Sequence, residues 1–125
     1  MATLTAQTKL TVSDIVADAI ALDISMTPTV IAGGITSKNL TSARATGSAL
    51  TIVEETYYSE GTTIYLRNMS ASETMYVELT AGTTHLCLKA LTWAVFPWTA
   101  ATDIKVYSTN STEVPTIEVG IFSAA

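Results

Sequence analysis

The sequence predicts an all-β fold, an antiparallel β-sandwich or jelly roll of about seven or eight strands with a short N-terminal arm and at most one short helix. Two observations predict it. Short runs of alternating apolar and polar residues recur every 8–12 residues or so through most of the 125-residue chain. In addition, 23 Thr and 11 Ser are present, and β-branched Thr suits half-exposed strands. Both observations indicate strands with one buried face and one solvent-exposed face.

The chain is expected to hold one domain, with residues 1–12 as an extended arm and residues 13–125 as a single β-sandwich. Its length fits one domain, and no Pro- or Gly-rich linker divides it. Two interpretations of Ser13–Leu22 stay open. Ser13 is a favourable N-cap before apolar residues at helical spacing, which favours a short helix, whereas alternation over Ala19–Ile24 indicates a strand. The helix is the preferred interpretation.

The later elements are expected as strands joined by turns. The first strand is Thr29–Ala32, ended by a turn at Gly33-Gly34, and Lys38–Gly47 is expected as a loop because it lacks apolar periodicity. The clearest strand is Thr74–Thr80, in which apolar and polar residues alternate at every position. The full set of later strands is Ala49–Glu55, Thr62–Asn68, Thr74–Thr80, Thr84–Lys89, Thr92–Trp98, Asp103–Tyr107 and Thr116–Phe122.

The charge content argues against several partners. Charged residues make up 14% of the chain, and the net charge is -5. A basic nucleic-acid surface and a polybasic membrane tether are therefore not expected. No run of about 18 apolar residues predicts a membrane span, and the N-terminal residues lack the pattern of a secretory signal. We expect no nucleic-acid partner and no membrane partner.

The residues that carry enzyme chemistry are sparse. His85 and Cys87 are the only residues of their types and share a strand face, but a zinc site needs three or four ligands and a Cys–His nucleophile needs a third orienting group. Glu54 and Glu55 are adjacent, so in a strand their side chains point to opposite faces. They are therefore poor candidates for the carboxylate pair of a glycosidase. Gly33-Gly34 lacks a phosphate-binding fingerprint. We expect no catalytic residue, no cofactor, no metal and no enzyme activity.

Aromatic and aliphatic residues are the better candidates for function. The Trp93–Trp98 segment is the one dense aromatic patch, and it has two interpretations: a corner of the core, or a contact between subunits, where Trp is enriched. Pro97 marks an edge or the end of a strand. Tyr57-Tyr58 lies near a turn, where an interface or a sugar could meet it. The interface candidates are Leu4, Leu10, Tyr57, Tyr58, Trp93, Phe96, Trp98 and Phe122.

The second half of the chain has an order of short motifs that resembles a known group. The motifs are Leu66-Arg67-Asn68, Met75-Tyr76-Val77, Leu88-Lys89-Ala90, Ala94-Val95-Phe96-Pro97, Ile104-Lys105-Val106 and Ile117-Glu118-Val119-Gly120-Ile121. This order resembles the small β-sandwich virion proteins of tailed bacteriophages over about Thr62–Phe122. Their pattern has a Leu-Lys-x-Gly-Glu turn. Leu91-Thr92 stands in place of Gly-Glu here, so this turn departs from the pattern.

The resemblance implies a non-enzymatic virion structural protein, first of all a capsid decoration (cement) protein on the head shell. A tail, baseplate or head–tail joining component is the alternative, as is a carbohydrate- or receptor-binding β-sandwich module. The implied partners are other virion proteins, with the major capsid protein before tail proteins, and further copies in a homo-oligomer. The implied location is the virion, after synthesis in the bacterial cytoplasm. Deletion of Met1–Leu10 is expected to leave a folded domain that assembles more weakly.

Overall fold

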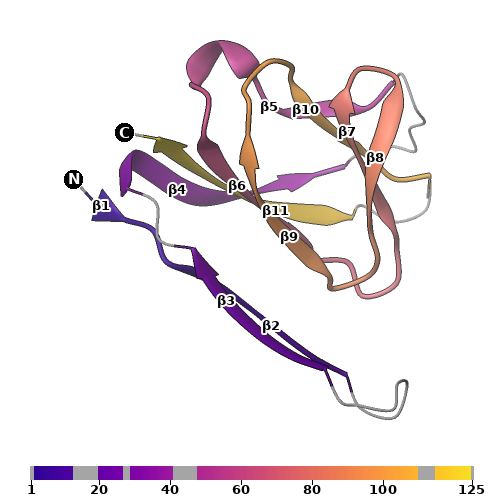
Figure 1. Cartoon of the computed structure of the whole chain (residues 1–125). Helices are drawn as coiled ribbons and strands as arrows, with labels where there is room; N and C mark the ends of the chain where they lie inside the picture. The colour runs from indigo at the N-terminus through magenta and orange to yellow at the C-terminus, as the bar shows by residue number, and fades with distance from the viewer. Residues whose placement is uncertain (1, 13–19, 27–28, 41–47, 110–114, 125) are drawn as a thin grey trace.

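Two antiparallel sheets and a separate hairpin make up the computed structural model, which describes residues 2–12, 20–26, 29–40, 48–109 and 115–124 (Figure 1). The five-stranded sheet has the order β1 (Ala2–Thr3), β4 (Thr29–Asn39), β11 (Thr116–Ala124), β6 (Thr62–Asn68), β9 (Trp93–Trp98). The four-stranded sheet has the order β5 (Leu50–Val53), β10 (Ile104–Tyr107), β7 (Met75–Thr80), β8 (Thr83–Leu88). The hairpin pairs β2 (Ala6–Val12) with β3 (Ile20–Met26).

The predicted all-β sandwich is confirmed. The helix that the described residues contain is one turn of 3-10 helix, η1 (Glu55–Tyr57). None of the described helical segments is long and apolar enough to cross a membrane. The strands expected between Ala49 and Phe122 are all present within a few residues of their predicted bounds. Pro97 lies in β9, which is an edge strand of its sheet, as its missing N–H requires.

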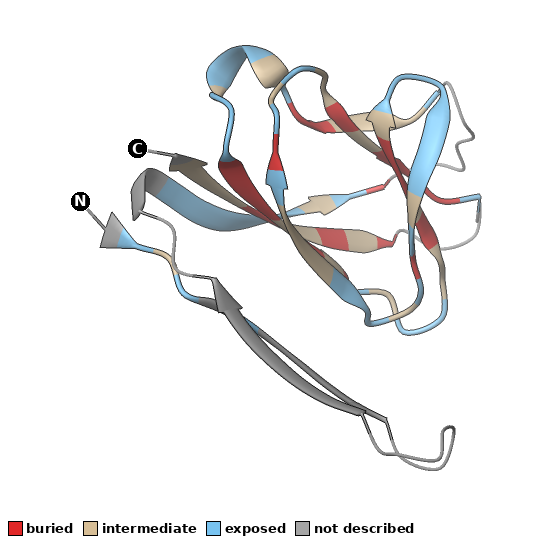
Figure 2. Ribbon diagram, in the orientation of Figure 1, coloured by how far each residue is buried: buried red, intermediate tan, exposed pale blue. Residues whose placement is uncertain are grey.

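The core lies between the two sheets, where each strand turns alternate residues inward. Ile64 and Leu66 of β6 are fully buried, and so is Val119 of the neighbouring β11. On the four-stranded sheet Val77 and Val106 are buried to the same extent. Figure 2 shows the buried residues gathered where the two sheets face each other. Each such side chain contributes about 1.5–3 kcal/mol of transfer free energy.

A buried asparagine fixes one end of the sandwich. Asn68 closes β6, and its Nδ2 donates hydrogen bonds to the carbonyl oxygens of Glu73 at 2.7 Å and Leu88 at 2.9 Å. Its Oδ1 accepts a hydrogen bond from the Ser70 N–H at 2.9 Å. One side chain thereby holds the β6–β7 turn and the end of β8, because it supplies the partners that these backbone groups would otherwise lack.

The helix predicted over Ser13–Leu22 is wrong where the structure describes it. Ile20–Leu22 belongs to strand β3, as the alternative interpretation held, and residues 13–19 lie outside the described residues. Seven consecutive pairs join β3 to β2, from Ala6↔Met26 to Val12↔Ile20. A helix of two or three turns is marginal on its own, so strand pairing outcompetes it. The expected boundary after residue 12 therefore cuts through a hairpin, and the arm is a pair of strands.

The turn predicted at Gly33-Gly34 is also wrong. Both glycines lie inside β4, which continues through Lys38 and Asn39, residues expected in a loop. The long partner strand explains the difference: β11 pairs with β4 at nine positions, from Thr116↔Asn39 to Ala124↔Val30. Residues 41–47 of the expected loop lie outside the described residues.

Candidate functional site

The outer face of the five-stranded sheet, meaning the side turned away from the four-stranded sheet, is the candidate site. Inward residues such as Leu66 and Val119 are buried, so their strand neighbours point outward. Two of these outward residues are large, apolar and open to solvent: Ile35 is 60% exposed and Trp93 is 48% exposed. Ile35 lies on β4 and Trp93 on β9, with β11 and β6 between them, so the candidate site spans the width of the sheet.

Strand register arranges the outer face in three adjacent rows. Gly120 of β11 is paired with Ile35 of β4 on one side and Tyr65 of β6 on the other, and Tyr65 is paired in turn with Val95 of β9. The rows on either side of this one are Ser37, Glu118, Arg67, Trp93 and Gly33, Phe122, Thr63, Pro97. Aromatic or aliphatic side chains occur in every row, and the row that contains Trp93 also contains Ser37, Glu118 and Arg67.

Two glycines keep the outer face flat. A Cβ on Gly33 would meet the Phe122 ring, with Cδ1 only 2.4 Å away. A Cβ on Gly120 would lie 3.0 Å from Tyr65 Cβ and 3.1 Å from Phe122 Cε2. The Phe122 ring therefore covers both glycine backbones and lies against the sheet. A low, aromatic surface of this kind suits contact with another flat protein face.

The polar groups of the outer face largely satisfy one another. The Tyr65 hydroxyl donates a hydrogen bond to Glu118 Oε1 at 2.8 Å. Burial raises the pKa of the Tyr65 hydroxyl above its usual value, and the Glu118 carboxylate raises it further, while Arg67 acts weakly in the opposite direction. Glu118 and Arg67 are also direct cross-strand partners of opposite charge. The Arg67 Nε is buried without a hydrogen-bond partner among the described residues, so covering this face would enclose one unpaired polar atom.

The interface candidates separate into exposed and buried groups. Trp93 and Phe122 lie on the outer face, as a contact role requires. Trp98 is only 5% exposed and packs against Tyr58, with ring centroids 6.2 Å apart, so it belongs to the core of this chain, and its contact role stays a prediction. Trp98 points inward because it alternates with outward Pro97 along β9.

The remaining candidates do not gather at one place. Tyr57 is 74% exposed on η1, away from the outer face. Phe96 is half-buried against the core, and Leu4 is half-buried between β1 and β2. Leu10 lies on β2, and its side chain is outside the description.

Three outer-face residues, Ile35, Tyr65 and Val95, are not among the interface residues that the sequence predicts. Ile35 was missed because the preceding glycines were interpreted as the end of a strand. Tyr65 and Val95 could have been found, since both alternate with inward residues in strands that were predicted correctly. An apolar or aromatic residue at such an outward position is the signal that identifies a contact face.

His85 and Cys87 lie together on the exposed side of β8. The His85 Nδ1 accepts a hydrogen bond from the Leu79 N–H at 3.2 Å, which ties β8 to the irregular end of β7. Within the described ranges, no three His, Cys, Asp or Glu residues lie close enough together to hold a metal ion. The geometry therefore gives this pair a structural hydrogen bond and supplies no third ligand.

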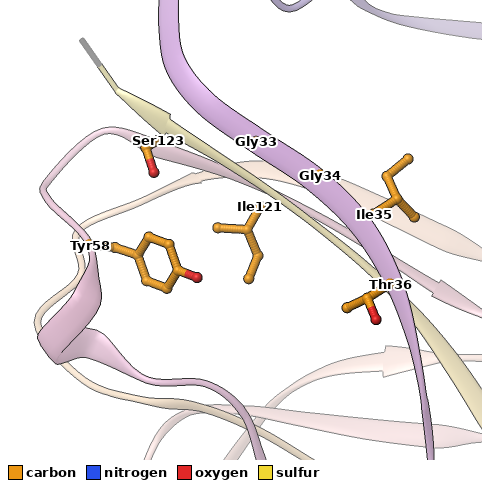
Figure 3. Close-up of a pocket in the computed structure, with 7 residues that line it drawn as sticks. All are labelled: Gly33, Gly34, Ile35, Thr36, Tyr58, Ile121 and Ser123. Atoms are coloured by element: carbon orange, nitrogen blue, oxygen red, sulfur yellow. The ribbon is translucent and has the colours of Figure 1, made fainter.

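A shallow hollow lies on the other side of β4, between this strand and the segment after η1. Figure 3 shows Tyr58 and Ile121 lining it, with Ile35 on the opposite side of the strand. The complete lining is Gly33, Gly34, Ile35, Thr36, Tyr58, Ile121 and Ser123. It holds no carboxylate, imidazole or amine, so we assign no reaction to it.

Comparisons with protein-family models, curated proteins and solved structures found no match to this chain. The chain is a β-sandwich with exposed apolar residues on the outer face of one sheet and a hairpin that extends beyond the sandwich.

Proposed function

We propose that this protein is a non-enzymatic structural subunit that packs its outer face against another protein. One observation carries the proposal: two large apolar side chains on the same outer face, Ile35 and Trp93, are 60% and 48% exposed, and the partly exposed Tyr65 lies between their strands. Contiguous exposed apolar surface marks sites of protein contact more often than singly exposed residues do. An exposed Trp at the centre of such a contact typically contributes much of the binding free energy.

The assembly that we propose is the virion of a tailed bacteriophage, with decoration of the head shell as the first choice. The motif resemblance over Thr62–Phe122 supports it. A backbone feature supports it as well: Leu91 has φ of 60° at the position where the resembling pattern has glycine. Glycine adopts this left-handed conformation freely. The turn of this chain therefore has the backbone conformation that suits glycine, although leucine occupies the position. A tail, baseplate or head–tail joining role would use the same surface.

A sugar-binding module fits the geometry less well. The aromatic residues expected to meet a sugar are Tyr57 and Tyr58, and they do not form an exposed pair because Tyr58 packs against the buried Trp98. On the outer face, Tyr65 and Phe122 are only partly exposed and lie against the sheet. A broad, low surface of this kind favours a protein partner.

The test uses two exposed aromatic residues, Trp93 on the outer face and Tyr57 on η1. Trp93→Glu places a charge on the outer face, and Tyr57→Glu places the same charge on η1. Light scattering would report the mass of each protein alone, and co-sedimentation with expanded phage heads would report binding. We expect Trp93→Glu to lose binding while Tyr57→Glu keeps it, because the substitution removes the exposed indole and a contact would have to bury a charge in its place.

Two results would overturn the proposal. Equal binding by Trp93→Glu and the unmodified protein would show that the outer face is not the contact. Failure of the unmodified protein to bind heads, tails or further copies of itself would remove the structural role altogether. Circular dichroism of each variant would show whether the sandwich stays folded, so a loss of binding can be assigned to the surface.

A further inference from the structure

The β2–β3 hairpin extends away from both sheets of its own chain (Figure 1). Along it, the register opposes Leu10 to Leu22 and Lys9 to Asp23, so apolar and polar pairs alternate. Such alternation is typical of strands that cover one face against a partner. An isolated two-stranded hairpin is marginally stable in water.

The edge of strand β4 offers a place for another strand. β1 pairs with this edge only at Thr29 and Val30, and from Ile31 to Asn39 no described strand pairs with the side of β4 opposite β11. Proteins usually protect such an edge with charges, Pro or a bulge. Within this stretch the sequence has a single charge, Lys38, and no Pro. The Lys38 ammonium donates to the Ile52 carbonyl oxygen at 2.9 Å, toward the other sheet, so the protection of this edge rests on one inward-pointing charge.

The hydrogen-bonding direction of the edge follows from one contact. The Leu40 N–H donates to the Pro115 carbonyl oxygen, on the β11 side, at 2.9 Å. Alternate residues of an antiparallel strand direct their N–H and C=O groups to the same side. The backbone groups of Lys38 and Thr36 therefore point to β11. The backbone groups of the residues that alternate with them, Ile35, Ser37 and Asn39, point to the open edge.

From this geometry we infer that the open edge of β4 binds the β2–β3 hairpin of a second copy of the chain, so that one sheet continues from subunit to subunit. The same chain already shows the pairing that would be extended, because β1 lies antiparallel on this edge at Ala2↔Val30 and Thr3↔Thr29. A partner strand would continue that row past Val30. Strand addition of this kind gives affinity through backbone hydrogen bonds.

The chain's own hairpin is excluded from this position. Only two residues separate Met26 of β3 from Thr29 of β4, so β3 would have to begin pairing at Thr29 and Val30. These are the residues that β1 occupies. The occupant must then come from another chain. Mutual exchange gives a closed dimer, and exchange along a series gives a ring or a fibre, which the measured mass distinguishes.

The decisive variant is Ser37→Pro. Proline removes the N–H that faces the open edge and leaves the bonds to β11 intact, a position at which sheets tolerate it. Ser37→Ala, which keeps the N–H, is the matched control. We expect light scattering to show an oligomer for the unmodified protein and Ser37→Ala, and the mass of one chain for Ser37→Pro. Amide exchange at Ile35, Ser37 and Asn39 should be slow in the oligomer and fast in the single chain.

A mixing experiment identifies the hairpin as the occupant. Leu22→Pro interrupts β3 but leaves the β4 edge intact, whereas Ser37→Pro blocks the edge but leaves the hairpin intact. Each variant alone should remain a single chain, and a mixture should form a complex with one copy of each. Absence of that complex would overturn the inference, as would an unmodified protein that stays a single chain. Trp93→Glu should leave the hairpin exchange unchanged. The exchange and the binding by the outer face can therefore fail independently, and the two proposals are tested separately.

Discussion

The Phe122 ring occupies the space that any side chain on Gly33 would need, since a Cβ there would lie 2.4 Å from Phe122 Cδ1 and 3.0 Å from the Ile121 carbonyl oxygen. Gly33→Ala therefore forces the ring off the sheet or shifts β4 relative to β11. We expect the free energy of unfolding to fall by about 1–3 kcal/mol, as for overpacked sites. The urea midpoint would measure this change.

Gly34 provides the control for that substitution. It is the next residue on the same strand, and a Cβ on it would meet no atom within 4 Å. Gly34→Ala should leave stability unchanged or raise it by up to about 1 kcal/mol, because alanine reduces the entropy of the unfolded chain. Equal destabilisation by the two variants would contradict the role assigned to the Phe122 ring.

Asn68 should be among the least replaceable polar residues of the sandwich. Its side chain is fully buried and binds the backbone at Glu73, Leu88 and Ser70. Asn68→Asp replaces a donor with an acceptor that faces carbonyl oxygens, and each buried group left unpaired costs about 1–3 kcal/mol. We expect a lower thermal midpoint for Asn68→Asp than for Asn39→Asp, since Asn39 is exposed. Equal midpoints would show that the turn does not depend on Asn68.

Leu91 is a site where a substitution should stabilise the protein. Its φ of 60° lies in the left-handed region, and its side chain is 53% exposed, so little packing offsets the strain. Leu91→Gly should raise the free energy of unfolding by about 1 kcal/mol. Leu91→Ala removes the side chain but keeps the strain, so it should not stabilise the fold. Denaturant midpoints of both variants would separate the backbone effect from the side-chain effect.

The contrast between β6 and β4 shows which parts of the fold could be predicted. β6 was predicted at its observed bounds because Ile64 and Leu66 alternate with Tyr65 and Arg67, and that alternation is local information. β4 was cut short at Gly33, because local rules assign a Gly-Gly pair to a turn. Its continuation depends on β11, a partner about 80 residues later, and no local pattern contains that pairing.

The candidate site was predictable only in part for the same reason. Trp93 and Phe122 were predicted as contact residues from their type alone, yet Trp98 has the same type and lies in the core. The row that joins Ile35 to Tyr65 through Gly120 exists only in the paired sheet. The hairpin was missed because Ser13 suggested a helix cap, while the pairing of Val12 with Ile20 decided the structure.

The alkaline stability of the protein should depend on Tyr65. Burial and the hydrogen bond to Glu118 raise the pKa of its hydroxyl in the folded chain above the usual value near 10. The unfolded chain therefore releases this proton at lower pH than the folded chain does. The stabilising contribution is complete below about pH 10 and is lost as the pH rises through the pKa of the folded state.

Tyr65→Phe removes that titration. Its free energy of unfolding should fall less steeply above about pH 10 than that of the unmodified protein, although the lost hydrogen bond lowers its stability at neutral pH. Tyr57→Phe, at a residue that is 74% exposed, should keep the steeper fall. Urea unfolding at a series of alkaline pH values would measure both slopes. Parallel slopes for Tyr65→Phe and the unmodified protein would show that the Tyr65–Glu118 pair does not control alkaline stability.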